Sequence, residues 1–91
     1  MDKTSVELFI RFTGMRAVHL TVRRGAVILG AVDFSFDKNF DTLLIATVDK
    51  ILKQTRISPM SLKCVRISGK VDKNSSAYKI AQTLANALKA L

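Results

Sequence analysis

The chain has 91 residues, a formal net charge of +8 and one cysteine, and 48% of its residues are hydrophobic. That hydrophobic fraction is enough for a buried core, so we expect one folded domain over residues 1–91 and exclude a disordered chain. The single cysteine excludes an internal disulfide, and no run approaches the roughly 20 apolar residues that a membrane-spanning helix needs.

The N-terminal segment and the lone cysteine favour a cytoplasmic protein. Asp2 and Glu7 interrupt the segment where a signal peptide would carry its apolar run, so we expect no signal peptide. A single cysteine fits a reducing compartment. The basic residues are spread along the chain without a block of five, which indicates a solvated cationic surface and not a basic arm. We expect Met1 and a helix ending at Leu91 to be natural ends.

Three segments at the start of the chain alternate apolar and polar residues, which predicts strands. They are residues 5–13, 16–23 and 26–36. The breaks between them, Gly14-Met15 and Arg24-Gly25, are short enough for hairpins, so the three strands should form an antiparallel meander. Within the third segment, Gly30 is predicted to mark a bulge or a close backbone approach.

The hydrophobic period then changes to that of a helix. Residues 37–56 carry one apolar stripe, and either Asp37 or Asn39 is expected to cap the helix start. Pro59 stops this helix, because the residue before a proline avoids helical geometry. Residues 62–67 are predicted to form a short fourth strand.

A second amphipathic helix closes the chain, and either Ser75 or Ser76 can cap it. The resulting order is β-β-β-α-β-α. A right-handed crossover through the first helix returns the chain to the sheet beside the first strand. The sequence therefore predicts an α+β fold of two layers. Its mixed four-stranded sheet has the order 3-2-1-4, and both helices cover one face.

Residues 43–69, LLIATVDKILKQTRISPMSLKCVRISG, carry a resemblance to a known family. They resemble part of the N-terminal lobe of the RNase H-like, actin-like ATPase superfamily, from its first helix to its fourth strand. The likeness is greatest to the TsaB-like family, the bacterial non-catalytic partner subunit of the enzyme that makes threonylcarbamoyladenosine in tRNA. Ser75-Ser76 and KIAQTLANAL follow where that family has its glycine-rich loop and next helix. The resemblance implies an RNase H-like half and a link to tRNA modification.

The chain departs from that superfamily where the superfamily binds nucleotides. Phe12, followed by Thr13, stands where the superfamily has an aspartate, and phenylalanine neither ligates magnesium nor acts as a base. Gly69 alone remains of the glycine-rich loop, and Lys70 is followed by Val71 and not by the serine or threonine of a P-loop. The second lobe is also missing. We therefore expect no cofactor, no metal ion, no small-molecule substrate and no enzymatic activity.

The two helices are the predicted site of protein association. In the resembled family they contact a catalytic subunit or a second copy, which implies a homodimer or a heterodimer with a larger actin-like subunit. Ile45, Ala46 and Ala87 lie off the main apolar stripes and indicate a second contact surface. The predicted apolar anchors are Leu44, Ile45, Val48, Leu84 and Leu88.

The polar face of the sheet offers an alternative function, a small basic RNA-binding domain. The first two strands place six side chains on this face: Glu7, Phe9, Arg11, His19, Thr21 and Arg23. RNA would contact Phe9, Arg11, Arg23 and Lys63, because aromatic rings stack on bases and cations bind phosphates. Against this alternative, Phe9 is a single aromatic, and Glu7 beside Arg11 indicates a mixed polar surface.

Structural roles explain the other reactive residues. His19 has no second histidine, cysteine pair or carboxylate cluster with which to hold a metal. Cys64 lies within a short strand and is predicted to be buried and inert. Asp33 and Asp37 are candidates for a carboxylate pair, but helix capping and solubility explain them better.

Overall fold

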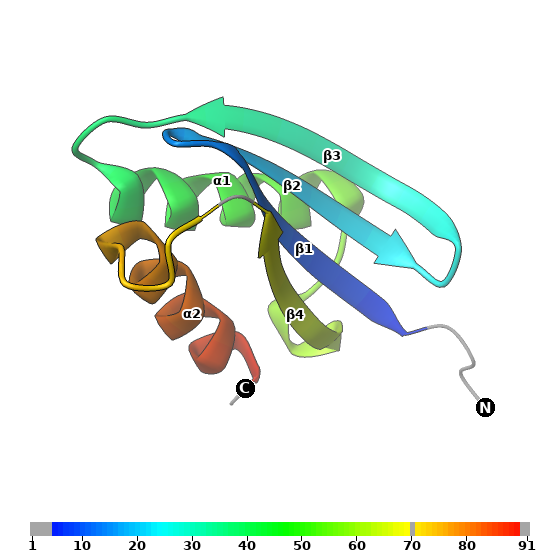
Figure 1. Cartoon of the computed structure of the whole chain (residues 1–91). Coiled ribbons are helices and arrows are strands. Elements are labelled where there is room, and N and C mark those ends of the chain that lie inside the picture. The colour runs from blue at the N-terminus through cyan, green and yellow to red at the C-terminus, as the bar shows by residue number, and fades with distance from the viewer. Residues whose placement is uncertain (1–4, 70, 90–91) are drawn as a thin grey trace.

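A computed structural model describes residues 5–69 and 71–89 (Figure 1). Its four strands form one mixed sheet in the order β3-β2-β1-β4. β1 pairs antiparallel with β2 and parallel with β4, and β2 pairs antiparallel with β3. The predicted meander, the return of the chain beside β1 and the strand order are therefore confirmed. The strands are β1 Val6–Gly14, β2 Ala17–Arg24, β3 Val27–Ser35 and β4 Leu62–Gly69.

Both helices lie on the same side of the sheet, which gives the two layers of the predicted α+β fold (Figure 1). α1 spans Phe40–Thr55 and α2 spans Ser76–Lys89, and a single 3₁₀ turn, η1, spans Pro59–Ser61 just before β4. Within the described ranges, no helix combines the length and the hydropathy that a bilayer crossing demands.

The core lies between the sheet and the helices. Successive side chains of a strand point to opposite faces, so every second residue of β1 and β2 turns toward the helix layer. Six of these strand residues are almost completely buried, together with Leu44 and Ile51 of α1 and Ala81 and Ala85 of α2. The six are Leu8, Ile10, Phe12, Val18, Leu20 and Val22. Removal of this apolar surface from water is the main force that holds the two layers together.

Gly30 brings the edge strand β3 close to the end of α1. A β-carbon added at Gly30 would lie only 2.7 Å from Cγ2 of Thr55. The pairing of β2 with β3 also shifts register between Val22 and Arg23, where Gly30 and Ile28 are the partners. The register shift agrees with the predicted bulge, whereas the close approach is to the Thr55 side chain and not to another backbone.

The start of α1 differs from the prediction. Asn39 occupies the cap position, but its side chain makes no capping hydrogen bond. Asp37 instead pairs with Arg16 of the β1–β2 turn, with 2.9 Å between Oδ1 and Nη1. The Asp41 carboxylate accepts a hydrogen bond from the Thr42 backbone N–H at 2.8 Å. Asn39 therefore holds the predicted cap position, but the predicted side-chain cap does not form.

The start of α2 has the serine cap that the sequence predicts. The Ser75 hydroxyl accepts a hydrogen bond from the Tyr78 backbone N–H at 3.2 Å, which selects Ser75 over Ser76. The expected helix end at Leu91 and the predicted loop residue Lys70 lie outside the described residues.

Candidate functional site

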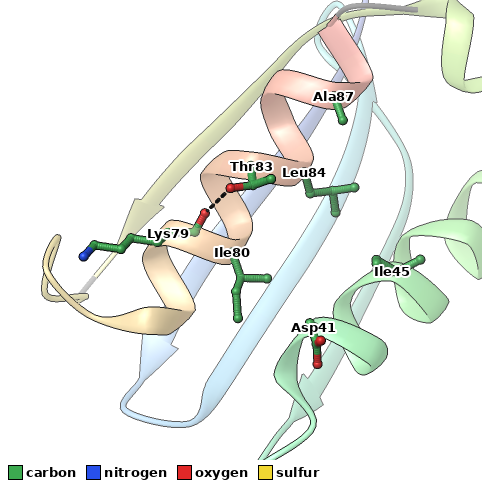
Figure 2. A pocket seen from close by; sticks show the side chains of 7 residues that line it. All are labelled: Asp41, Ile45, Lys79, Ile80, Thr83, Leu84 and Ala87. Atoms are coloured by element: carbon green, nitrogen blue, oxygen red, sulfur yellow. Dashed lines mark hydrogen bonds between the residues drawn. The ribbon is translucent and has the colours of Figure 1, made fainter.

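The outer surface of the helix layer is hollowed by a groove between α1 and α2 (Figure 2). The groove encloses about 450 Å³ and is lined mainly by apolar side chains. In Figure 2, Ile80 and Leu84 of α2 point toward α1, on which Ile45 lies opposite them. The lining residues are Asp41, Ile45, Lys79, Ile80, Thr83, Leu84 and Ala87.

Helical geometry separates Ile45 from its buried neighbours. A helix turns about 100° per residue, so residues at spacing four share a face while the next residue points elsewhere. Leu44 and Val48 point to the sheet, whereas 57% of the Ile45 surface stays exposed. A single exposed isoleucine is ordinary, but an exposed isoleucine beside Ile80 and Leu84 forms a continuous apolar surface of the kind that marks interfaces.

The structure places the five predicted interface anchors in three different environments. Leu44 is 0% and Val48 is 5% exposed, so both belong to the core and present no surface to a partner. The prediction of these two as anchors was wrong because the helix stripe that they share faces the sheet. Ile45 and Leu84 line the groove, and Leu88 is half-buried against the core outside the groove lining.

Two further groove residues extend the surface along α2. Ile80, which was not among the predicted anchors, lines the groove, and so does Ala87, one of the three residues predicted to lie off the main apolar stripes. Ala46 is exposed but is not part of the groove lining. Positions 80, 84 and 87 follow the i, i+4, i+7 spacing of one helix face, and this spacing is the signal in the sequence that identifies them.

The polar residues of the groove lie around its apolar part. The Thr83 hydroxyl donates a hydrogen bond of 2.9 Å to the Lys79 carbonyl oxygen in its own helix, so its donor is already satisfied (Figure 2). Asp41 on α1 and Lys79 on α2 carry opposite charges, and neither is in an ion pair among the described residues. The groove therefore presents an apolar centre with one acidic and one basic edge.

A core side chain lies near the C-terminal end of β1. Phe12 is 1% exposed, and its ring centroid lies 5.9 Å from that of Phe40. Gly69, at the end of β4, has a φ of +101° and lies against the Phe12 backbone, where an added β-carbon would overlap the Phe12 carbonyl oxygen. Close packing and backbone geometry thus account for this glycine.

The loop before α2 uses its backbone donors internally. The Val71 N–H donates to the Gly69 carbonyl oxygen at 3.1 Å, and the Asn74 N–H donates to the Asp72 carboxylate at 2.9 Å. The Ser75 N–H donates to the Asp72 carbonyl oxygen at 2.9 Å. A phosphate cradle needs several N–H groups that point freely at the anion. These three N–H groups are already bound by the protein.

The second candidate surface is the sheet face that the helices leave uncovered. The strand pairing places Phe9 of β1 between Thr21 of β2 and Arg66 of β4. The six side chains that the sequence assigns to this face do belong to the alternating positions opposite the core. Lys63 is exposed, and it is the extra residue where the β1–β4 register shifts between Leu62 and Cys64.

The Phe9 ring is not free to stack on a base. The guanidinium carbon of Arg23 lies 5.3 Å from the centroid of this ring, in a cation–π contact. The ring and the arginine border a shallow hollow of about 240 Å³. The hollow is lined by Phe9, Arg11, His19, Thr21, Arg23, Ile28 and Ser68.

The polar pairs around the hollow differ from the carboxylate pair considered from the sequence. His19 Nδ1 is hydrogen-bonded to Asp33, and Asp37 pairs with Arg16, so Asp33 and Asp37 do not meet. In the described part of the chain, histidine, cysteine, aspartate and glutamate side chains form no group of three that would suit a metal ion.

Cys64 shares a hydrogen bond with Glu7 on the same face. Its Sγ lies 3.1 Å from the Glu7 carboxylate, and Nε of Arg66 lies 3.9 Å from the same oxygen. Burial and the acceptor Glu7 raise the pKa of the Cys64 thiol, with burial the larger cause. The thiol is half-buried rather than buried as predicted, and its raised pKa favours the unreactive protonated form.

Comparison with known proteins identifies the fold. No protein-family model matches the sequence, and no curated protein matches it. Among solved structures, the chain is similar to YeaZ from Pseudomonas aeruginosa, with a TM-score of 0.75 and 13% sequence identity. The likeness covers 92% of this chain and 38% of the YeaZ chain. The two proteins therefore share a fold over somewhat more than a third of the YeaZ chain.

Proposed function

We propose that this chain is a non-catalytic protein-association module that binds a second copy of itself through the groove between α1 and α2. The observation that carries the proposal is the exposed Ile45 beside the apolar face of α2. Two likenesses agree with this proposal: the sequence resembles the TsaB-like partner subunits, and the chain shares its fold with part of YeaZ. A larger actin-like subunit of a tRNA-modifying enzyme is the alternative partner.

The filled nucleotide position supports a role without catalysis. Phe12 is packed in the core and offers no oxygen to a magnesium ion. In the loop before α2, the N–H groups of Val71, Asn74 and Ser75 already have acceptors in the protein. Both features remove groups that phosphoryl chemistry would require, and they leave the groove as the surface best suited to a role in binding.

The edges of the groove favour a twofold arrangement. In a dimer with twofold symmetry, residue i of one copy contacts residue j of the other, and the reverse contact forms as well. Asp41 and Lys79 carry opposite charges on different helices of one groove. Pairing each with its counterpart across the dyad would form two ion pairs around an apolar centre built from two Ile45 side chains.

Light scattering coupled to size exclusion tests this proposal with one matched pair of variants. We expect the wild type to be a dimer that high salt leaves intact, because the centre of the contact is apolar. Ile45→Asp should give a folded monomer. Met60→Asp is the control, because Met60 is 75% exposed on η1 and does not line the groove. If both variants remain dimers, the dimer contact lies outside the groove. If the wild type is monomeric, self-association is excluded and the larger actin-like subunit remains as the proposed partner.

A further inference from the structure

The hollow on the open sheet face has a positive lining. Arg11 of β1 and Arg23 of β2 border it, and no aspartate or glutamate is among its lining residues. Within the described ranges, neither arginine lies within ion-pair distance of a carboxylate. The acids nearest in the strand register are already engaged, Glu7 by Cys64 and Arg66, and Asp33 by His19. The hollow therefore suits an anion.

Arg23 retains hydrogen-bonding capacity that the protein does not use. An arginine has five N–H donors. Nη2 of Arg23 donates to the Gly25 carbonyl oxygen at 3.4 Å, which is a long bond, and Nε is enclosed without any acceptor. The guanidinium carbon lies over the Phe9 ring, 5.3 Å from its centroid. Arginine planes held in this way stack on nucleic-acid bases, and their remaining donors bind phosphate oxygens.

Hydroxyl groups add neutral polar contacts to the same hollow. Thr21 and Ser68 line it from β2 and β4, and Ser68 pairs in register with Arg11. A serine or threonine hydroxyl can donate to a phosphate or a ribose oxygen and can accept from a base N–H. The lining thus combines two cations, two hydroxyls and a planar stacking surface, which are the groups that bind one nucleotide unit.

We propose that the open sheet face binds single-stranded nucleic acid. One phosphate lies between Arg11 and Arg23, and the adjacent base stacks on the Arg23 guanidinium, which Phe9 supports from below. An unpaired strand is required, because bases inside a duplex are stacked on one another and their faces are covered. An acidic peptide would neutralise the arginines but would leave the stacking surface unused.

This binding site is independent of the proposed association groove. The groove lies on the outer side of the helix layer, and the hollow lies on the sheet face that the helices do not cover. A dimer formed through the helices would leave the uncovered sheet face of each copy open to a strand of nucleic acid. Failure of one proposal therefore leaves the other standing.

Fluorescence anisotropy with a labelled oligouridylate of about ten nucleotides measures the interaction, because such a strand exceeds one nucleotide unit without forming a duplex. We expect binding at about 50 mM salt that weakens steeply toward about 200 mM. The double variant R11Q/R23Q should lose at least about tenfold in affinity. Affinity falls as salt rises, and each lost phosphate contact should make the slope of log K against log salt shallower by about 0.7, which is the value for single strands.

The control variant K38Q/K50Q removes the same charge from two exposed lysines outside the hollow. We expect it to retain most of the affinity, and the single variant R11Q to show part of the loss with an unchanged unfolding midpoint. Equal losses in the two double variants would overturn the proposal, because net charge alone would then explain binding. Inorganic phosphate that competes as well as the oligonucleotide would also overturn it, in favour of a site for a single anion.

Discussion

Gly69 lies so close to the Phe12 backbone that a β-carbon at position 69 would overlap the Phe12 carbonyl oxygen, and its φ of +101° disfavours any other residue. This contact joins the end of β4 to the end of β1. The glycine at the end of β4 is therefore explained by packing, without any need for a bound phosphate.

Replacing this glycine should destabilise the protein. We expect Gly69→Ala to lower the free energy of unfolding by about 2 kcal/mol or more, because strained backbone alone costs about 1–3 kcal/mol and steric overlap adds to it. Urea unfolding followed by circular dichroism measures the change. Gly14→Ala is the matched control, because a β-carbon there meets only the Ala17 side chain at 3.9 Å. Equal effects at both positions would contradict this account of Gly69.

The engaged loop donors and the buried Phe12 lead us to expect no binding of magnesium-ATP. A ligand at about 100 times its Kd stabilises a protein by about 2.7 kcal/mol, which thermal shift detects easily. We expect the unfolding midpoint to stay constant when magnesium-ATP is added, relative to magnesium with an inert salt of equal ionic strength. A saturable increase that requires magnesium would show that the chain retains a nucleotide site.

Leu44 and Ile45 are neighbours in α1 with opposite environments, so their truncations should differ. Leu44→Ala should cost about 2–5 kcal/mol of stability, because it leaves a cavity in the core. Ile45→Ala should cost under about 1 kcal/mol in the monomer, because that side chain is mostly exposed. Chemical denaturation at concentrations too low for association separates the two. Similar costs would mean that α1 is rotated relative to the sheet.

Glu7 should control the acidity of the Cys64 thiol. Burial and the Glu7 carboxylate raise its pKa, so Glu7→Gln should lower the pKa and speed alkylation by iodoacetamide at mildly alkaline pH. A raised folded-state pKa means that the folded protein favours the neutral thiol. This contribution to stability is complete below the unfolded pKa and is lost as pH rises through the folded pKa. An unchanged alkylation profile would show that burial alone sets the shift.

Much of the backbone architecture follows from local sequence patterns. Alternation, short hairpin breaks and one crossover are enough to place β4 beside β1, because few topologies satisfy all three. The bulge at Gly30 and the Ser75 cap were also predictable, since both depend on the conformational preferences of one residue type.

The surfaces were less predictable, because they depend on contacts between residues far apart in sequence. Helical spacing placed Ile45 off the apolar stripe of α1, but it did not show that Leu44 and Val48 are buried and present no surface to a partner. In the same way, alternation placed Phe9 and Arg23 on one sheet face without showing that the arginine covers the ring.

The most direct test of the central claim is the dimer dissociation constant, measured by sedimentation equilibrium for the wild type and for variants in which the charges of Asp41 and Lys79 are reversed singly and together. The claim is that the groove meets its own copy, with Asp41 opposite the Lys79 of a second copy. We expect Asp41→Lys and Lys79→Asp each to weaken the dimer, and the double variant to recover most of the lost affinity because the pairs re-form with reversed charges. A monomeric wild type, or four constants that do not differ, would contradict the account.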